Sequence, residues 1–360
     1  MAEPTQKPRL IHLADLIERD IRQRGLRPGD QYLTAAETAR MLSSNTSAVN
    51  RALQLLVQRG VLERKPRKGA CVAQPRDHET SSPLSRVHLL VHQNDIRTEG
   101  LLLDGTIIGI QSELPGAEAQ FDFMPLDDSE AFTEKLISET LRRAEPNGFV
   151  LVRSTLASQR CMARSGLPTV VFGSLFPSVT SLPWIERDHF NGGRMLVEHA
   201  LSQGCKRIIV LVRERGGPGD YLFNDGIRQA LANASMLTSA LTIRPLPADL
   251  EAISAEVGAL LEATQGRAGI IARSELLANG AIAAAERRGM KLGEDISILV
   301  SDFYRRGADA PPALPHLVPT IGPEGMGAHI GRMLAQQARG ERVDPNHEII
   351  SQRLVLPDVS

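Results

Sequence analysis

The chain has 360 residues, of which 42% are hydrophobic and 23% charged, and its formal net charge is −1. This is the composition of a soluble globular protein, and the length allows two or three domains with a sizeable core. The start lacks the apolar run of a signal peptide, and no apolar segment approaches the ~20 residues needed to span a bilayer. We therefore expect a cytoplasmic protein with no membrane partner.

Charge is distributed unevenly along the chain. Residues 1–75 contain 13 Lys and Arg against 7 Asp and Glu, whereas residues 76–360 contain 28 against 35. A small basic domain on a mildly acidic body suggests that the first part meets a polyanion and the second does not. An accidental skew is the alternative on charge alone.

The cysteines predict neither a disulfide framework nor a metal site. Cys71, Cys161 and Cys205 are odd in number and widely spaced, so we expect buried small hydrophobic residues. His88 and His92 would share one strand face, but two histidines are weak grounds for a metal. We predict no metal and no cofactor.

Two helices are expected before residue 43. In residues 10–24 the apolar side chains keep the spacing of one helical face, and Gly25 follows where a left-handed C-terminal residue is favoured. After a turn at 27–30, Thr34 and Glu37 form the T-x-x-E pattern of a capping box and open a short second helix that continues through Leu42.

A third helix and a hairpin follow. Asn45 is a good N-cap, and the helix runs to Gly60 with apolar residues on its inner face and Ser47, Asn50, Arg51 and Gln54 on its outer face. Residues 61–64 and 70–73 predict two short strands joined by the basic turn 65–69. The result is three helices and a β-wing.

This arrangement suits a DNA duplex. The third helix can enter the major groove while the wing lies along the backbone or the minor groove. Small polar residues near the helix start leave its amides free to approach a phosphate. The alternative is a merely solvated helix followed by a charged hairpin.

The segments GLRPGDQ, ETARML, VNRALQLLVQRGVLER and KGACVA resemble the winged helix of the GntR family of bacterial transcription regulators over residues 9–73. Members commonly have Ser-Arg-x-Thr at the start of the recognition helix, where this chain has Asn45 to Ala48, so Thr46 replaces an arginine. The resemblance implies DNA contacts from helix two, helix three and the wing: Arg40, Thr46, Ser47, Asn50, Arg51, Lys65, Arg67, Lys68 and Gly69.

The remaining chain predicts an α/β fold with parallel sheets. Residues 76–85 are polar and rich in Pro and Ser, which is typical of a linker between domains 1–75 and 86–360. Apolar strands then alternate with amphipathic helices. The expected strands are 87–91, 120–125, 148–152, 169–172, 207–212, 241–245, 268–272 and 296–300. The expected helices include 129–144, 192–203, 252–264 and 276–288.

Three segments, residues 188–211, 282–303 and 319–341, resemble the effector domain of LacI-type repressors, which has the periplasmic-binding-protein fold. This second resemblance covers roughly residues 85–360 and implies a two-lobed type I domain. Together the two resemblances imply an arabinose-repressor-type architecture, with a GntR head on a LacI-type body.

Ligands of open parallel sheets bind beyond the carboxyl ends of the strands, so residues at those ends are the effector-site candidates. Strand ends give His92, Arg153, Arg273 and, just beyond, Glu275. The resemblance adds Asp188 and Asp302 as carboxylates for ligand hydroxyls, and it places Phe223 where the family often has a ligand-binding arginine. For Asp188, a helix N-cap is the alternative.

Carboxylates and guanidinium groups bind hydroxyls, and an aromatic face can cover the apolar side of a sugar ring. Trp184, Tyr221 and Phe223 are expected in loops where they could stack on a ligand; ordinary packing is the alternative for each. A sugar or related polyol is therefore the expected effector.

We predict a homodimeric transcriptional regulator, a repressor, that binds a double-stranded operator and responds to a small molecule held between two α/β lobes. The GGPGD segment at 216–220 lacks the Gly-Lys-Ser/Thr of a phosphate loop, and common hydrolase motifs are missing, so we do not expect an enzyme. An enzyme fused to a DNA-binding head and a structural nucleic-acid-binding protein are the alternatives.

Overall fold

The structure, a computed structural model, describes residues 9–59, 61–65, 69–73, 82–92, 104–125, 127–143, 145–264, 266–301 and 314–357. These residues form two compact units. The first holds the described residues up to 92, those of 104–185 and those of 323–348, and the second holds those of 186–322 and those from 349 on. In these ranges no helix has the length and apolar character needed to cross a membrane.

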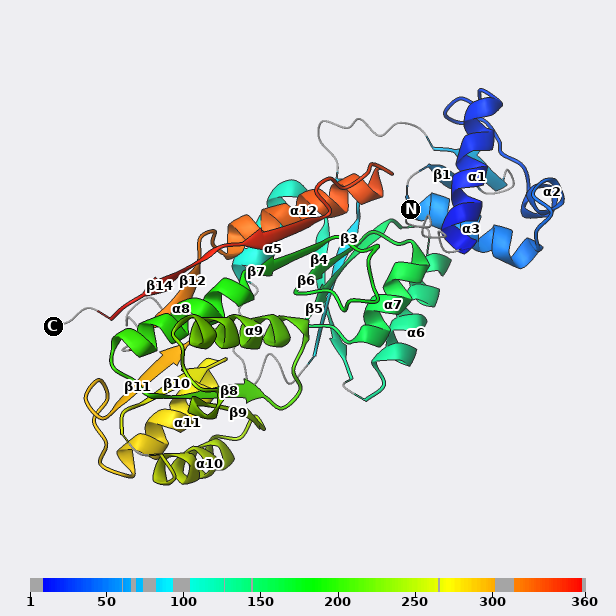
Figure 1. Cartoon of the computed structure of the whole chain (residues 1–360). Helices are drawn as coiled ribbons and strands as arrows, with labels where there is room; N and C mark the ends of the chain where they lie inside the picture. The colour runs from blue at the N-terminus through cyan, green and yellow to red at the C-terminus, as the bar shows by residue number, and fades with distance from the viewer. Residues whose placement is uncertain are drawn as a thin grey trace. The chain divides into compact units, whose positions relative to one another are not determined.

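The first unit begins with three helices and a two-stranded sheet. These are α1 (Arg9–Gln23), α2 (Ala35–Met41), α3 (Thr46–Gln58), β1 (Leu62–Lys65) and β2 (Gly69–Val72) (Figure 1). Both predicted N-caps are confirmed. The Thr34 hydroxyl accepts from the Glu37 amide at 3.3 Å and Glu37 accepts from the Thr34 amide at 2.8 Å, while Asn45 Oδ1 accepts from the Ala48 amide at 2.6 Å.

The two strands form the predicted wing. They are antiparallel and pair from Leu62 with Val72 to Lys65 with Gly69. The segment before α2 bonds to β2, because the Tyr32 amide donates to the Ala70 carbonyl at 2.8 Å. Apolar residues of α1, α3 and β1 are buried in one core: Leu13, Ala14, Ile17, Val49, Ala52, Leu56 and Leu62. The predicted winged helix-turn-helix is confirmed.

The rest of the first unit is a six-stranded sheet in the order β13-β7-β6-β5-β3-β4. Its strands are β3 (Arg86–His92), β4 (Glu118–Met124), β5 (Asn147–Val152), β6 (Thr169–Phe172), β7 (Trp184–Arg187) and β13 (His347–Ile350). Neighbours from β4 to β7 are parallel. The helices are α5 (Asp104–Glu113), α6 (Ser129–Arg142), α7 (Leu156–Ser165) and α12 (Pro323–Ala338).

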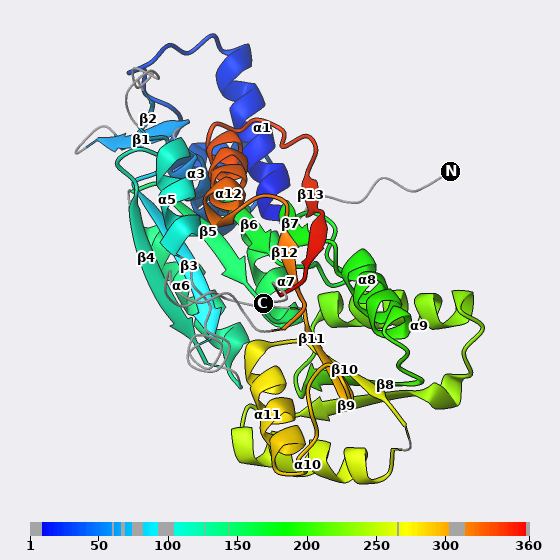
Figure 2. The ribbon, with the colours of Figure 1, turned by 90° about the vertical axis from the view of Figure 1, so that its left-hand side faces the viewer.

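Alternate residues of β5 contact helices on opposite faces of this sheet. Phe149 belongs to the core that contains Ile137 of α6 and Met162 of α7, whereas Gly148 lies against Leu334 of α12. On the α12 face, α5 and α12 lie side by side (Figure 2). A Cβ on Gly109 of α5 would lie 2.0 Å from the Glu324 carbonyl oxygen, so the two helix backbones touch.

The second unit has its own six-stranded sheet in the order β14-β12-β11-β10-β8-β9. The strands are β8 (Arg207–Arg213), β9 (Leu241–Leu246), β10 (Ala268–Ala272), β11 (Ile296–Val300), β12 (His316–Pro319) and β14 (Gln352–Val355). All neighbours are parallel except β12 and β14. The helices are α8 (His189–Ser202), α9 (Pro218–Asn233), α10 (Leu250–Glu262) and α11 (Glu275–Glu286).

Helices cover both faces of this sheet as well. Ile208 and Val210 of β8 pack with residues of α8 and α9, and Ile209 and Leu211 pack with residues of α10 and α11 (Figure 1). Each six-stranded sheet is therefore the middle layer of a three-layer α/β structure, and the predicted fold class is confirmed.

All eight predicted strands are present, within two residues at either end. Four strands were missed: β7, β12, β13 and β14, each of four residues. The prediction that Tyr221 and Phe223 lie in a loop is wrong, because both are in α9. Trp184 was also assigned wrongly to a loop, because it opens β7.

Candidate nucleic-acid interface and effector site

The outer face of α3 is polar and open to solvent. Thr46, Ser47, Asn50 and Arg51 are exposed, while Val49, Ala52, Leu53 and Leu56 are buried in the domain core. The helical period separates these two sets, so the sequence itself determines which side chains can meet a partner. Arg40, on α2, is also exposed.

The structure adds to this face one residue, Arg64, that was not predicted from the sequence. Arg64, on β1, is exposed, and its Nη2 donates to Oδ1 of Asn50 at 3.2 Å. In the sequence, Arg64 directly precedes the basic turn 65–69. Only the position of the folded hairpin next to α3 shows that this arginine contacts Asn50.

The tip of the wing is described only in part. Gly69 has a φ of +77°, which a residue with a side chain adopts at a cost, and this explains glycine at the start of β2. Arg67 and Lys68 lie outside the described residues, as does the side chain of Lys65. Their contacts to DNA stay predictions.

Three effector-site candidates lie in the first unit. His92 ends β3 and is buried, with Nδ1 3.2 Å from the carbonyl oxygen of Met124. Arg153 follows β5 with a φ of +46°, an unusual conformation for a residue other than glycine. Trp184 stacks on His347, with ring centroids 5.3 Å apart. This contact agrees with the packing alternative, and ligand stacking by the half-buried Trp184 stays a prediction.

In the second unit, the carboxyl ends of β8, β10 and β11 meet around one buried arginine. Arg273, directly after β10, donates from Nε to Asp220 Oδ1 and from Nη1 to Ser301 Oγ, both at 2.7 Å. Arg213, the last residue of β8, has Nη1 3.6 Å from the same Asp220 oxygen. Arg273 is thus part of an internal network and is only 2% exposed.

Asp220, the carboxylate of this network, is ionised at neutral pH. Burial by itself raises the pKa of Asp220, but the charges of Arg273 and Arg213, with the hydrogen bond from the Gly217 amide, outweigh burial and lower that pKa to about 2. Asp220 also caps the start of α9 by accepting from that amide at 2.8 Å. The glycine-rich segment at 216–220 is therefore a helix start stabilised by a carboxylate.

The two aromatic candidates of α9 lie on different faces of the helix, one buried and one exposed. Phe223 is fully buried in the core, and the Arg273 guanidinium carbon lies 4.5 Å from the centre of its ring. This position agrees with the packing alternative, and ligand stacking by Phe223 stays a prediction. Tyr221 is 67% exposed and stays available to a ligand or a partner.

The structure describes two of the three acidic candidates, Asp188 and Glu275, and each lies at the start of a helix. Asp188 is the N-cap of α8, and its Oδ1 accepts from the Asn191 amide at 3.0 Å, in agreement with the helix-cap alternative. Glu275 is half-buried at the first position of α11, directly after the N-cap Ser274. Asp302 lies outside the described residues.

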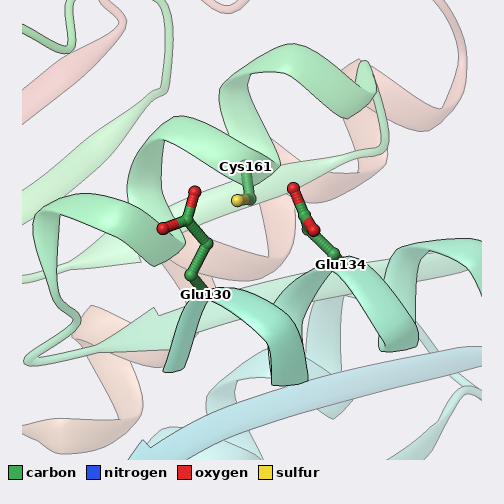
Figure 3. Close-up of side chains that lie close together, drawn as sticks. All are labelled: Glu130, Glu134 and Cys161. Carbon is green, nitrogen blue, oxygen red and sulfur yellow. The ribbon is translucent and has the colours of Figure 1, made fainter. Parts of the chain in front are cut away.

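One further cluster joins α6 to α7. The carboxylates of Glu130 and Glu134 and the thiol of Cys161 approach one another, with their potential ligand atoms within 4.8 Å (Figure 3). Burial raises the pKa of the Cys161 thiol, and a contact from Arg164 opposes this effect only in part. Because a thiol binds a metal after losing its proton, the raised pKa works against ligation.

Two family profiles match the chain. The profile "Bacterial regulatory proteins, gntR family" matches residues 11–72, and the profile "Periplasmic binding protein-like domain" matches residues 197–356. The chain is 24% identical to the HTH-type transcriptional repressor CytR of Escherichia coli (strain K12) over 227 residues, which cover 62% of this chain and 65% of CytR. The match thus spans slightly less than two thirds of that relative.

Solved structures share the fold. A transcriptional regulator CelR-cellobiose complex aligns with a TM-score of 0.62 at 18% identity and covers 90% of this chain and 95% of that chain. A LacI family transcriptional regulator from Enterococcus faecium with bound ribose aligns with a TM-score of 0.58 at 19% identity, over 75% and 96% of the two chains. The chain therefore combines a gntR-family winged helix-turn-helix domain with a periplasmic-binding-protein-like α/β domain of type I fold.

Proposed function

We propose that this protein is a transcriptional regulator, specifically a repressor, whose affinity for an operator is controlled by a small-molecule effector, a sugar or related polyol. The observation that carries the proposal is the exposed polar face of α3 beside a β-wing, on a domain with 13 Lys and Arg against 7 Asp and Glu in residues 1–75. A major groove admits one α-helix, and the wing can contact the adjacent backbone. Such a protein works at the chromosome, so we place it in the cytoplasm.

The α/β domain supports the sensing half of the proposal. Charged side chains gather at the carboxyl ends of β8 and β10, the end of a parallel sheet where ligands bind. Two solved structures with this fold are complexes, one with cellobiose and one with ribose. Named relatives are repressors and regulators, which favours regulation over catalysis. Turnover of a sugar by the purified chain would contradict this assignment.

Direct selection of duplexes tests the DNA-binding half. The full chain is incubated with a random duplex library, the bound fraction is sequenced, and affinities are measured at two salt concentrations. Arg51→Ala is expected to weaken the selected duplex about 10- to 100-fold and a random duplex much less, because a base contact carries the specificity. Arg228→Ala, which removes an exposed arginine of α9, is the control and should leave both affinities unchanged. Equal losses on both duplexes for Arg51→Ala would contradict base reading.

The sensing half is tested by linkage. Small sugars and polyols are screened by thermal shift, and each hit is tested for release of the selected duplex. An effector that lowers duplex affinity tenfold must itself bind tenfold more weakly to the duplex-bound protein. Equal effector affinity with and without the duplex would refute the mechanism.

We also propose that the protein is a homodimer, in keeping with a palindromic operator. The edge strand β4 of the first unit exposes Phe121 and Phe123 on one face, 38% and 53% accessible, and a second copy would cover them. Phe123→Glu is expected to raise the dimer dissociation constant at least tenfold, measured by sedimentation velocity. Leu250→Glu, at an exposed apolar position of α10, is the control and should leave the dimer intact. An unchanged dimer for Phe123→Glu would exclude this face.

A further inference from the structure

The base-reading face of α3 is poor in cations. Among the 13 residues of the helix only Arg51 is basic. The first turn of the helix has no acidic residue, and the last turn has no basic residue. A guanine presents two acceptors, O6 and N7, in the major groove, and an arginine is the side chain that pairs with both. A helix with one arginine therefore offers one such contact, unless a neighbouring element supplies another.

The wing supplies a second guanidinium to the same face. Arg64 Nη2 bonds to Oδ1 of Asn50, and Asn50 lies one helical turn after Thr46 and Ser47, so these four residues share one surface. In the part of the chain that the structure describes, no ion pair with a carboxylate involves Arg64. The Asn50 amide is neutral, so it orients the guanidinium without cancelling its charge.

We propose that Arg64, oriented by Asn50, reads a guanine at the edge of the operator half-site; this inference rests on the proposed DNA-binding function. The guanidinium is planar and has five N–H donors. Asn50 takes one donor and reduces the rotamer freedom that would otherwise be lost on binding, which leaves an edge for O6 and N7. A phosphate contact would need the charge alone, whereas guanine recognition also needs the planar fork.

The experiment uses the full chain and the same random duplex library, with wild type, Arg64→Ala, Arg64→Lys and Asn50→Ala. Wild type is expected to select a G·C pair at one position that Arg64→Ala no longer selects, with an affinity loss of about 10- to 100-fold on the selected duplex. Arg64→Lys should lose the same preference, because it keeps the charge but not the fork. Asn50→Ala should weaken the preference at that position too. A double variant with both Asn50→Ala and Arg64→Ala should lose less binding free energy on the selected duplex than the sum of the two single losses, because the two residues act together.

The outcomes separate this inference from the function beneath it. If wild type selects no sequence, the proposed function fails. If wild type selects a sequence and Arg64→Ala weakens selected and random duplexes equally, or Arg64→Lys keeps the preference, Arg64 contacts a phosphate and the inference is overturned. Arg22→Ala, at an exposed arginine of α1, controls for loss of charge and should keep the selected sequence. Melting curves of all variants establish that each is folded.

Discussion

Replacing Arg273 by methionine is expected to lower the free energy of unfolding by about 3–5 kcal/mol, because it leaves a buried carboxylate without its main partner. Arg273 is 2% exposed and bonds to both Asp220 and Ser301, so water cannot take its place. The measurement is urea unfolding followed by circular dichroism. Arg287→Met is the matched control: Arg287 pairs with Glu251 on the surface, where both side chains are more than half exposed, and its loss should cost less than about 1 kcal/mol. Equal losses for the two variants would show that the Arg273 network contributes no special stability.

The same network predicts how stability depends on pH. Asp220 has an ordinary pKa of 3.8, and the folded protein lowers it to about 2. A lowered carboxyl pKa means that the unfolded chain binds the proton more readily. The contribution, on the order of 2 kcal/mol, is therefore complete above about pH 4 and is lost as the pH falls toward 2. Asp220→Asn should unfold more readily at pH 7 and lose less stability than wild type between pH 4 and pH 2.

Gly226→Ala is expected to destabilise the second unit by about 3 kcal/mol or more. A Cβ at this position would lie 1.9 Å from the carbonyl oxygen of Phe190, and backbone cannot move aside as a flexible side chain can. The substitution would otherwise favour a helix by about 1 kcal/mol, so a loss isolates the packing effect. Gly322→Ala, where no atom lies within 4 Å of the added Cβ, is the control and should change stability by less than about 0.5 kcal/mol. A neutral Gly226→Ala would mean that α8 and α9 are less closely packed than the structure has them.

Local signals allowed the sequence to determine the winged helix and most of the α/β pattern. The capping box at Thr34 and Glu37 and the N-cap at Asn45 act within three residues, so they can be identified without knowing the fold. The exposed set on α3 follows from the helical period alone. Six of the eight predicted strands, β3, β5, β6, β8, β10 and β11, are buried along most of their length, so they form apolar runs that can be identified in the sequence, whereas β4 and β9 are partly exposed.

Four short strands and the start of α9 did not carry such local signals. β7, β12, β13 and β14 each span four residues that include polar or charged side chains, whereas the equally short β6, which was predicted, is a mostly apolar run of Thr, Val, Val and Phe. The run at 216–220 has the composition of a loop, and it begins a helix only because Asp220 accepts from the Gly217 amide while its carboxylate is held by Arg273. This is why Tyr221 and Phe223 were assigned to a loop.

The tertiary structure alone decided which side chains meet. Asp220 and Arg273 are 53 positions apart, Asn50 and Arg64 are 14 apart, and α12 completes the unit that contains α5 although more than 200 residues separate them. No local propensity encodes such pairs, because they form when strands pair and close helix–helix contacts at glycines bring distant segments of the backbone together. The sequence thus determined what most elements are and which face of α3 is polar, whereas the fold decided that Arg273 is a buried partner and that Arg64 lies beside Asn50 of α3.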